Sequence, residues 1–193
     1  ETGVYDRNRK FYTTISPSMD ILISSNLERL LYHLSGGNDE LIREWFESLK
    51  QTGKYEVTPE VLEKIKADFC AGFCDDDETK DLIKRIFDKY SYLCDTHTAV
   101  AVKVYEDYVE KTGDTTKTLI ASTANPYKFS SSVLSALGEF DDSLDEFELV
   151  EKLNSVSRMD VPKSLAELKS KEVRFTTIID RNDMKDFVLK TLA

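Results

Sequence analysis

Histidine and cysteine are scarce in this sequence of 193 residues, which holds two histidines and three cysteines. The two histidines lie far apart, so we do not expect a metal site built on histidine. Cys70 and Cys74 are spaced by four and Cys94 stands alone, and no second pair or nearby histidine completes a zinc site. On a helix that spacing places both thiols on one face, which favours a buried apolar role over a transient disulfide.

Long apolar runs are missing as well, since no stretch approaches the ~20 residues of a membrane span. The N-terminal residues ETGVYDRNRK are polar and lack the apolar region of a signal peptide. The formal net charge is −10, which makes nucleic acid and anionic membranes poor partners. With an odd cysteine count, we expect a cytoplasmic location. The missing N-terminal Met suggests a fragment of a longer chain.

Several sequence motifs of catalysis and nucleotide binding do not occur. The chain contains no G-x-G-x-x-G, no P-loop and no G-x-S-x-G. The acidic run Asp75–Glu78 lacks the alternating ligands and central glycine of a calcium loop, so we interpret it as the start of a helix. No carboxylate pair can be singled out for acid–base chemistry among 36 acidic residues.

What the sequence does contain indicates a soluble globular protein of the α/β class with a helical excess. Hydrophobic residues make up 40% and charged residues 32% of the chain. β-branched and aromatic runs predict strands at Lys10–Ser16 and Thr116–Ser122, with a candidate third strand at Val173–Asp180. Apolar residues at helical spacing, with capping residues before them and glycines after them, predict helices over most of the remainder.

The order of these elements suggests two regions. Between Gly37 and Leu93 the sequence predicts helices alone, which we interpret as a helical insertion at about residues 38–93. It would interrupt a catalytic domain spanning residues 1–142. The acidic remainder, residues 143–193, would form a helical tail that includes the candidate strand at 173–180.

The stretch TLIASTANPYKF marks a candidate ligand site. Asn125 and Pro126 suit the start of a helix, with a capping side chain followed by a residue whose missing N–H costs nothing there. The hydroxyls of Ser122 and Thr123 stand where the predicted strand ends. Hydroxyls at that place are poor packing residues but good hydrogen-bond partners for a ligand, and α/β proteins bind ligands at such strand ends.

A second polar cluster, CDTHTAVAV, begins another predicted helix. Asp95 or Thr96 can cap it, and His97 then lies in the first turn, where the helix dipole favours a neutral imidazole. We expect His33, within LLYHLSG, to be a packed or half-exposed helix residue.

Three of these stretches resemble segments of one family of enzymes, in their residues and in their order along the chain. FYTTISPSMDILISSNLERLLYHLSG resembles the threonine synthase segment that follows the glycine-rich loop for the cofactor phosphate. CDTHTAVAVKVYEDY resembles that family's Asp-Pro-His-(Thr/Ala)-Ala-Val-Ala segment, and LIASTANPYKF its (Ser/Gly)-Thr-Ala-(His/Ser)-Pro-Ala-Lys-Phe segment. VPKSLAEL also resembles a stretch near the family's C-terminus, so the resemblance extends over nearly the whole chain.

The resemblance implies part of a fold-type II enzyme that uses pyridoxal 5'-phosphate (PLP), similar to tryptophan synthase β. Such an enzyme is a carbon–oxygen lyase acting on phosphates, which converts O-phospho-L-homoserine and water to L-threonine and phosphate in threonine biosynthesis. By the matching motif Thr123 meets the pyridine nitrogen of the cofactor, and Ser122 and His97 are further candidate cofactor-binding residues. A hydroxyl leaves that nitrogen unprotonated, whereas a carboxylate would hold it protonated.

The sequence departs from the family's pattern in several ways. Asn125 stands where the family often has His, and Thr96 where it has Pro. The Schiff-base lysine and the glycine-rich phosphate cup are expected upstream, and Lys128 matches a different family position. The resemblance therefore implies a C-terminal fragment, inactive alone, whose partner is the missing N-terminal portion of the same polypeptide and which can self-associate. The alternatives are another fold-type II PLP enzyme, such as a serine or threonine dehydratase, and a non-catalytic helical interaction module.

Overall fold

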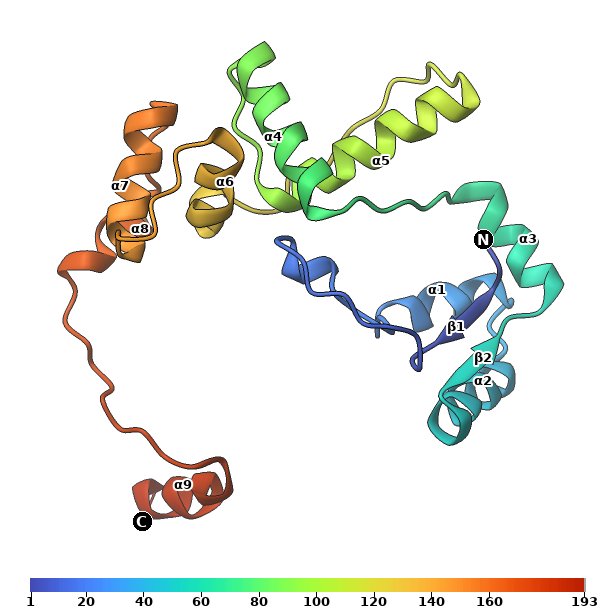
Figure 1. The fold of residues 1–193 in the computed structure, drawn as a ribbon. Helices are drawn as coiled ribbons and strands as arrows, with labels where there is room; N and C mark the ends of the chain where they lie inside the picture. Colours follow the sequence, from blue (N-terminus) through green and yellow to red (C-terminus); the bar gives the residue numbers. More distant parts are fainter. Residues whose placement is uncertain (193) are drawn as a thin grey trace. The chain divides into compact units, whose positions relative to one another are not determined.

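The computed structural model describes residues 1–192, and these residues form two compact units. The first unit runs from Glu1 to Arg158, and the second begins at Met159. Both units are dominated by helices, and the described residues contain a single two-stranded sheet. Figure 1 shows the elements in chain order.

The N-terminal part of the first unit is a small sheet surrounded by three helices. Strand β1 (Val4–Asp6) runs antiparallel to β2 (Lys54–Glu56) and places Tyr5 opposite Tyr55. These two rings stack with their centroids 4.8 Å apart. The helices are α1 (Leu27–Leu34), α2 (Asp39–Thr52) and α3 (Pro59–Asp68).

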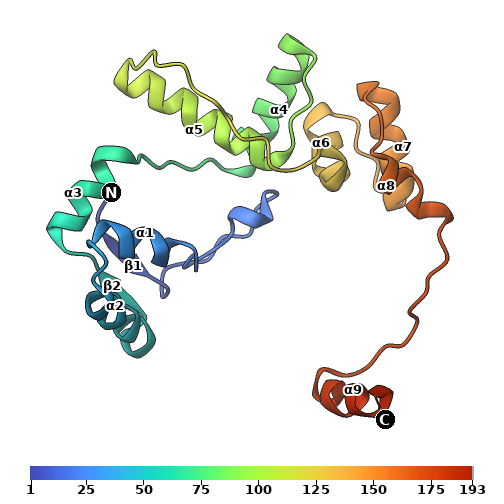
Figure 2. The ribbon, with the colours of Figure 1, turned by 180° about the vertical axis from the view of Figure 1, so that it is seen from behind.

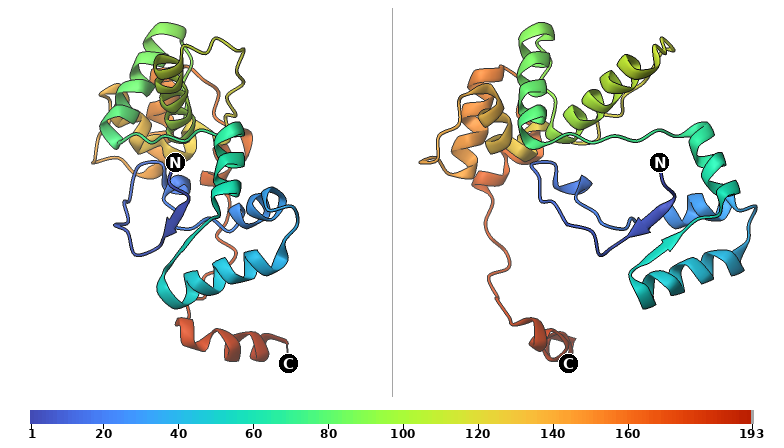
Figure 3. Two further views of the ribbon diagram at one scale, coloured as in Figure 1. Left: turned by 90° about the vertical axis from the view of Figure 1, so that its right-hand side faces the viewer. Right: turned by 45° about the vertical axis from the view of Figure 1, so that its right-hand side comes forward.

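One apolar core joins these elements, which lie together in the ribbon of Figure 3. Trp45 and Tyr55 lie at its centre with near-parallel rings 6.1 Å apart. Burial of Tyr55 raises the pKa of its hydroxyl, because desolvation disfavours the charged form. The buried members of the core come from β2, the residue after it and all three helices: Leu31, Ile42, Trp45, Tyr55, Val57 and Val61.

Capping side chains begin α2 and α4 (Asp76–Tyr90) as predicted, whereas the side chain of Asn26, before α1, makes no capping hydrogen bond. Asn38 accepts a hydrogen bond from the Leu41 N–H at 3.0 Å, and α2 ends at Gly53 with a φ of 83°. Asp75 begins α4 with a capping box in which Glu78 takes the reciprocal part. The acidic run is therefore a helix start.

The C-terminal part of the first unit is built around four α-helices. Helix α4 packs against α5 (Thr96–Thr112) and α6 (Ser130–Leu137), and α6 packs against α7 (Glu146–Ser157). Figure 2 shows these four helices as neighbours along the chain. Their core consists of side chains with at most 1% exposure: Ile83, Leu93, Val133, Leu134 and Leu153.

All three predicted strands are wrong for the chain as it folds here. Lys10–Ser16, Thr116–Ser122 and Val173–Asp180 contain no strand. Nothing in the described residues pairs with them, and an extended segment without a ladder partner leaves its backbone groups to water. The residues after α5 instead run back along that helix as an extended, exposed stretch (Figures 1 and 2).

The predicted insertion is likewise not purely helical. Strand β2 lies inside it, between α2 and α3, and pairs with β1. The compact units also differ in extent from the expected regions. Helix α7, expected in the tail beyond residue 142, packs on α6 and belongs to the first unit.

The second unit contains two short helical stretches joined by extended chain. They are α8 (Lys163–Ala166) with the 3-10 turn Leu168–Ser170, and α9 (Met184–Leu192) after the turn Arg181–Asp183. No residue of these elements is buried, and the linking residues Phe175 and Ile178 are almost fully exposed. Among the described helices, none combines the length and apolar character needed to span a membrane.

Substitution of Ala99 tests the packing of the α5 start. Its side chain is fully buried, so Ala99→Leu has no space and should lower the free energy of unfolding by about 1–3 kcal/mol. Ala67→Leu, at an exposed position of α3, is the matched control and should have little effect. Urea denaturation measures both, and equal stability of the two variants would contradict the burial of Ala99.

Candidate functional site

Thr123 lies where the extended stretch after α5 ends. Its side chain is exposed, and its hydroxyl makes no hydrogen bond with any described residue. Two residues later Asn125 accepts a hydrogen bond from the Tyr127 N–H at 3.0 Å and begins the 3-10 turn η2 (Pro126–Phe129). The cap that the sequence predicted is thus confirmed, and it directs the chain into α6 immediately after an exposed hydroxyl.

The side chain of Ser122, next to Thr123, forms hydrogen bonds with two other residues of the chain. Its Oγ lies 3.1 Å from the Thr98 hydroxyl in the first turn of α5 and 3.3 Å from the hydroxyl of Tyr92. Both partners are more than twenty residues away in sequence: Tyr92 precedes α5 and Thr98 lies in its first turn. Ser122 therefore links the end of the extended stretch to the start of α5.

His97 is also engaged by protein groups on both ring nitrogens. Nε2 accepts a hydrogen bond from the Ser18 N–H at 3.1 Å, while Nδ1 faces Asp95 Oδ1 at 3.3 Å. A nitrogen that accepts from an amide carries no proton, so this geometry assigns the neutral ring with its proton on Nδ1. The ring also packs against Phe129, with centroids 4.8 Å apart. His97 thus joins three segments of the chain.

Asp95 is the polar centre of this region. Its carboxylate is fully buried and caps α5: Oδ1 accepts from the His97 N–H at 2.9 Å and from the Thr98 N–H at 3.3 Å. Oδ2 accepts a short hydrogen bond from the Thr98 hydroxyl. Backbone donors at the positive end of a helix are what a buried carboxylate needs to remain charged.

The structure therefore brings Ser122 and His97 to one end of α5, through Thr98 and Asp95 respectively. Sequence reasoning identified Asp95 only as a helix cap and gave no polar role to Tyr92 or Thr98. The spacing Asp95-x-x-Thr98 was the available signal, because a side chain three residues into the first turn can reach the capping carboxylate. His33 lies elsewhere, exposed on α1, with its ring 5.8 Å from that of Tyr32.

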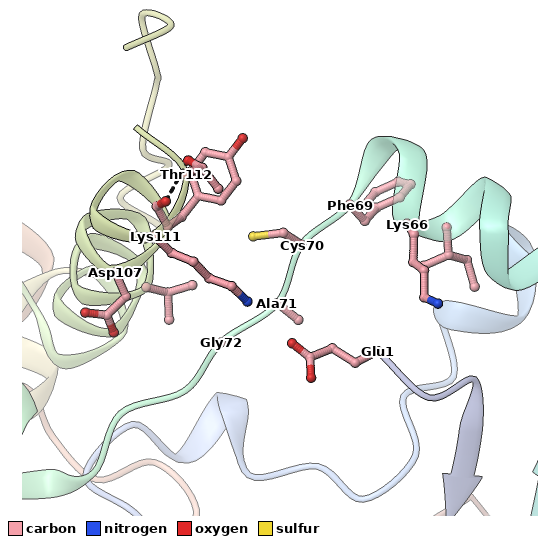
Figure 4. Close-up of a pocket in the computed structure, with 12 residues that line it drawn as sticks. Glu1, Lys66, Phe69, Cys70, Ala71, Gly72, Asp107, Lys111 and Thr112 are labelled. Carbon is pink, nitrogen blue, oxygen red and sulfur yellow. Dashed lines mark hydrogen bonds between the residues drawn. The ribbon is translucent and has the colours of Figure 1, made fainter. Parts of the chain in front are cut away.

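A separate groove of about 420 Å³ lies between the end of α3 and α5 (Figure 4). The segment from Phe69 to Gly72 forms its floor, and Lys66 and Lys111 contribute charged side chains. A Cβ on Gly72 would come within 2.9 Å of Val104, so glycine is required for this close approach to α5. None of the residues predicted for the ligand site lines this groove.

The cysteine interpretation is partly wrong. Helix α3 ends at Asp68, so Cys70 and Cys74 lie on irregular chain and share no helical face; Cys70 is exposed. Cys94 is buried, and burial raises the pKa of its thiol to about 11. No group of three or more His, Cys, Asp or Glu side chains among residues 1–192 is arranged to hold a metal ion.

The fold and the site are those of the α/β class. Extended segments rich in apolar residues, interleaved with amphipathic helices, are typical of an α/β domain. A free hydroxyl at the end of such a segment, supported from a neighbouring helix start, is typical of ligand sites in that class.

Comparisons with known proteins identify the family. Residues 98–188 match the family model "Threonine synthase, C-terminal". Threonine synthase of Saccharomyces cerevisiae is 35% identical over 208 residues, which cover 100% of this chain and 38% of the relative. A crystal structure of threonine synthase from yeast matches with a TM-score of 0.79 at 32% identity, covering 99% of this chain and 38% of that one.

A second solved structure agrees. The PLP-bound threonine synthase of Brucella melitensis has a TM-score of 0.77 at 32% identity and covers 96% of this chain and 36% of that one. The chain belongs to the threonine synthase family, whose structures are fold-type II PLP enzymes, and matches their C-terminal region. It spans less than two fifths of the length of these relatives.

The cysteine environments predict selective alkylation. The thiolate is the reactive form, so exposed Cys70 should react with iodoacetamide near pH 8, whereas buried Cys94, whose pKa is raised to about 11, should stay unmodified. Cys94 should become reactive only as the pH approaches that value or on unfolding in urea. Peptide mass spectrometry measures both sites, and equal labelling rates in the folded chain would contradict the burial of Cys94.

Proposed function

We propose that this chain is the C-terminal part of a threonine synthase that converts O-phospho-L-homoserine and water to L-threonine and phosphate with the help of PLP. The observation that carries the proposal is the free hydroxyl of Thr123, at the end of an extended segment within the sequence STANP. The PLP-bound relative from Brucella melitensis supports the cofactor assignment.

The residues present fit one part of a PLP site. PLP supplies the conjugated ring that withdraws electrons from the reacting carbon atoms. The Thr123 hydroxyl would meet the pyridine nitrogen, for which an exposed hydroxyl without a protein partner is suited. An uncharged partner leaves that nitrogen without a proton, and so moderates the electron withdrawal that a carboxylate would enhance. Ser122 and His97 would support this contact through their protein partners.

The proposal assigns the remaining functions to the rest of the polypeptide. The lysine that binds the cofactor covalently and the backbone donors for its phosphate would come from the upstream part. That part would also supply strand partners for residues 10–16 and 116–122, which expose large apolar side chains: Phe11, Tyr12, Leu119 and Ile120. We also propose a cytoplasmic location, on the odd number of cysteines in the sequence.

A second candidate activity is that of a serine or threonine dehydratase, which is also a fold-type II PLP reaction. The resemblance of residues 16–31 to threonine synthases, and the family-model match over residues 98–188, favour the first candidate. Product analysis separates the two. The complete enzyme supplied with O-phospho-L-homoserine should release equal amounts of L-threonine and phosphate, whereas a dehydratase would release ammonia and a 2-oxo acid from serine or threonine.

Substitution of Thr123 in the complete enzyme tests the cofactor contact. Thr123→Val keeps the shape and removes the hydroxyl, so it should weaken cofactor-dependent turnover by roughly 1–3 kcal/mol in activation free energy, the cost of leaving a polar partner unpaired. Thr123→Ser retains the hydroxyl and should have a mild effect. Steady-state kinetics with O-phospho-L-homoserine measures both, and wild-type turnover of the Val variant would contradict the assignment.

The 193-residue chain alone should be inactive. One hydrogen bond, worth about 0.5–1.5 kcal/mol net, is too weak to hold a charged cofactor against its hydration. A spectral titration with PLP should therefore show no band of lysine-bound cofactor, and no threonine should form. Borohydride reduction and peptide mapping provide the check: one stoichiometric adduct at a single lysine would overturn the proposed division of the site.

The same chain should expose apolar surface and self-associate, because large apolar side chains that the upstream part would cover are in water. Binding of a hydrophobic dye and sedimentation velocity measure this. Leu119→Ser, at a side chain that is 94% exposed, should reduce both signals. The matched control Ser131→Ala, on the exposed face of α6, should leave them unchanged.

A further inference from the structure

The extended segment that presents Thr123 has little to hold it within this chain. Residues 116–123 form no backbone ladder in the described structure, and most of their side chains are exposed. The hydrogen bonds of Thr116 and Thr118 are local, to Asp114 and within the segment. Ser122 makes the long-range hydrogen bonds, so its side chain fixes the end of the segment.

The bond between Ser122 and Thr98 is part of a network of hydroxyls. The Thr98 hydroxyl lies within donating distance of two acceptors: Asp95 Oδ2, in a short bond, and Ser122 Oγ at 3.1 Å. Ser122 Oγ also accepts from the hydroxyl of Tyr92 at 3.3 Å. The Ser122 side chain is therefore held from two sides.

The carboxylate of Asp95, to which Thr98 bonds, is held in place by the start of α5. Asp95 is fully buried, and its Oδ1 is fixed by two backbone N–H groups of α5. Its second oxygen is free of the cap and aligns Thr98, which is 4% exposed. Helix capping alone requires only one carboxylate oxygen. The second oxygen bonds to the Thr98 hydroxyl and so holds it beside Ser122.

We propose that Thr98, aligned by Asp95, is a positioning residue that acts through Ser122 to hold Thr123 at the cofactor ring. The inference rests on the proposed function of Thr123, and it adds residues that never touch the cofactor. A small displacement of Ser122 displaces Thr123 with it, since the two residues are adjacent. A hydrogen bond to a ring nitrogen weakens steeply with misalignment.

The test uses the complete enzyme and a double-mutant cycle. Thr98→Val removes the hydroxyl while keeping the shape, and should weaken PLP binding about fivefold, as expected for the loss of one hydrogen bond. Thr98→Ser should restore the wild-type affinity. If Thr98 acts through Thr123, combining Thr98→Val with Thr123→Val should weaken binding no further than Thr123→Val alone. Fluorescence titration of the apoenzyme with PLP measures the affinity.

Thr79→Val is the matched control. Thr79 is also buried in the first turn of a helix behind a capping aspartate, and its hydroxyl bonds to the Asp75 carbonyl oxygen at 2.6 Å. This variant should lower the melting temperature as Thr98→Val does, but leave PLP affinity within about twofold of wild type. Should Thr98→Val fail to fold, Ser122→Ala removes the same link from an exposed position and should show the same non-additivity with Thr123→Val.

The outcomes separate the inference from the proposed function. Additive losses in the cycle, or wild-type PLP affinity of Thr98→Val and Ser122→Ala, would overturn the positioning role while the contact of Thr123 stands. Wild-type PLP affinity and turnover of Thr123→Val would instead overturn the proposed contact itself. Loss in Thr98→Val, rescue by serine and no further loss in the double variant would establish the positioning role.

Discussion

The buried carboxylate of Asp95 is the interaction on which this region of the molecule depends. A charge without exposure to water costs several kcal/mol unless it is fully satisfied, and here the first turn of α5 satisfies it with two N–H groups and a hydroxyl. The same carboxylate faces His97, whose other nitrogen receives the Ser18 N–H. One side chain thus fixes the start of α5 and joins the N-terminal segment to it.

Two different kinds of stabilisation coexist in the first unit. The β1–β2 sheet and its helices have a core of their own around Trp45 and Tyr55, and the helices α4 to α7 have another around Ile83 and Leu134. Two segments, residues 10–13 and 116–123, are extended, exposed and without ladder partners among the described residues. Their apolar side chains are typical of buried strands, which agrees with the proposal that an upstream part of the polypeptide would cover them.

The start of α5 supports the exposed segment that ends at Thr123. Thr123 has no ladder to hold it, but the neighbouring Ser122 is bonded to a helix start that is itself capped and buried. On the proposed function, the contact of Thr123 with the cofactor would depend on this buried helix start. Support of a ligand-contacting group by a second layer of hydrogen-bonded side chains is general in enzyme sites, because the contacting group must be held within fractions of an ångström.

The sequence by itself determined where six helical segments begin. Asn38, Thr58, Asp75, Asp95, Asn125 and Asp145 all cap as their residue types predict, because a capping bond involves only neighbouring residues. The residues of three motifs also sufficed to identify the family. Both kinds of signal, helix caps and family motifs, consist of residues that are contiguous in the sequence.

Only the tertiary structure decided the strands, the cysteines and the support of the site. Lys10–Ser16 and Thr116–Ser122 have strand-forming residues, but a strand exists only with a partner, and the partner is not encoded in the segment itself. Cys70 is exposed because α3 ends at Asp68, where the chain turns toward α5. Thr98 meets Ser122 across 24 residues, a contact that no local pattern specifies, because it depends on how the extended chain returns along α5.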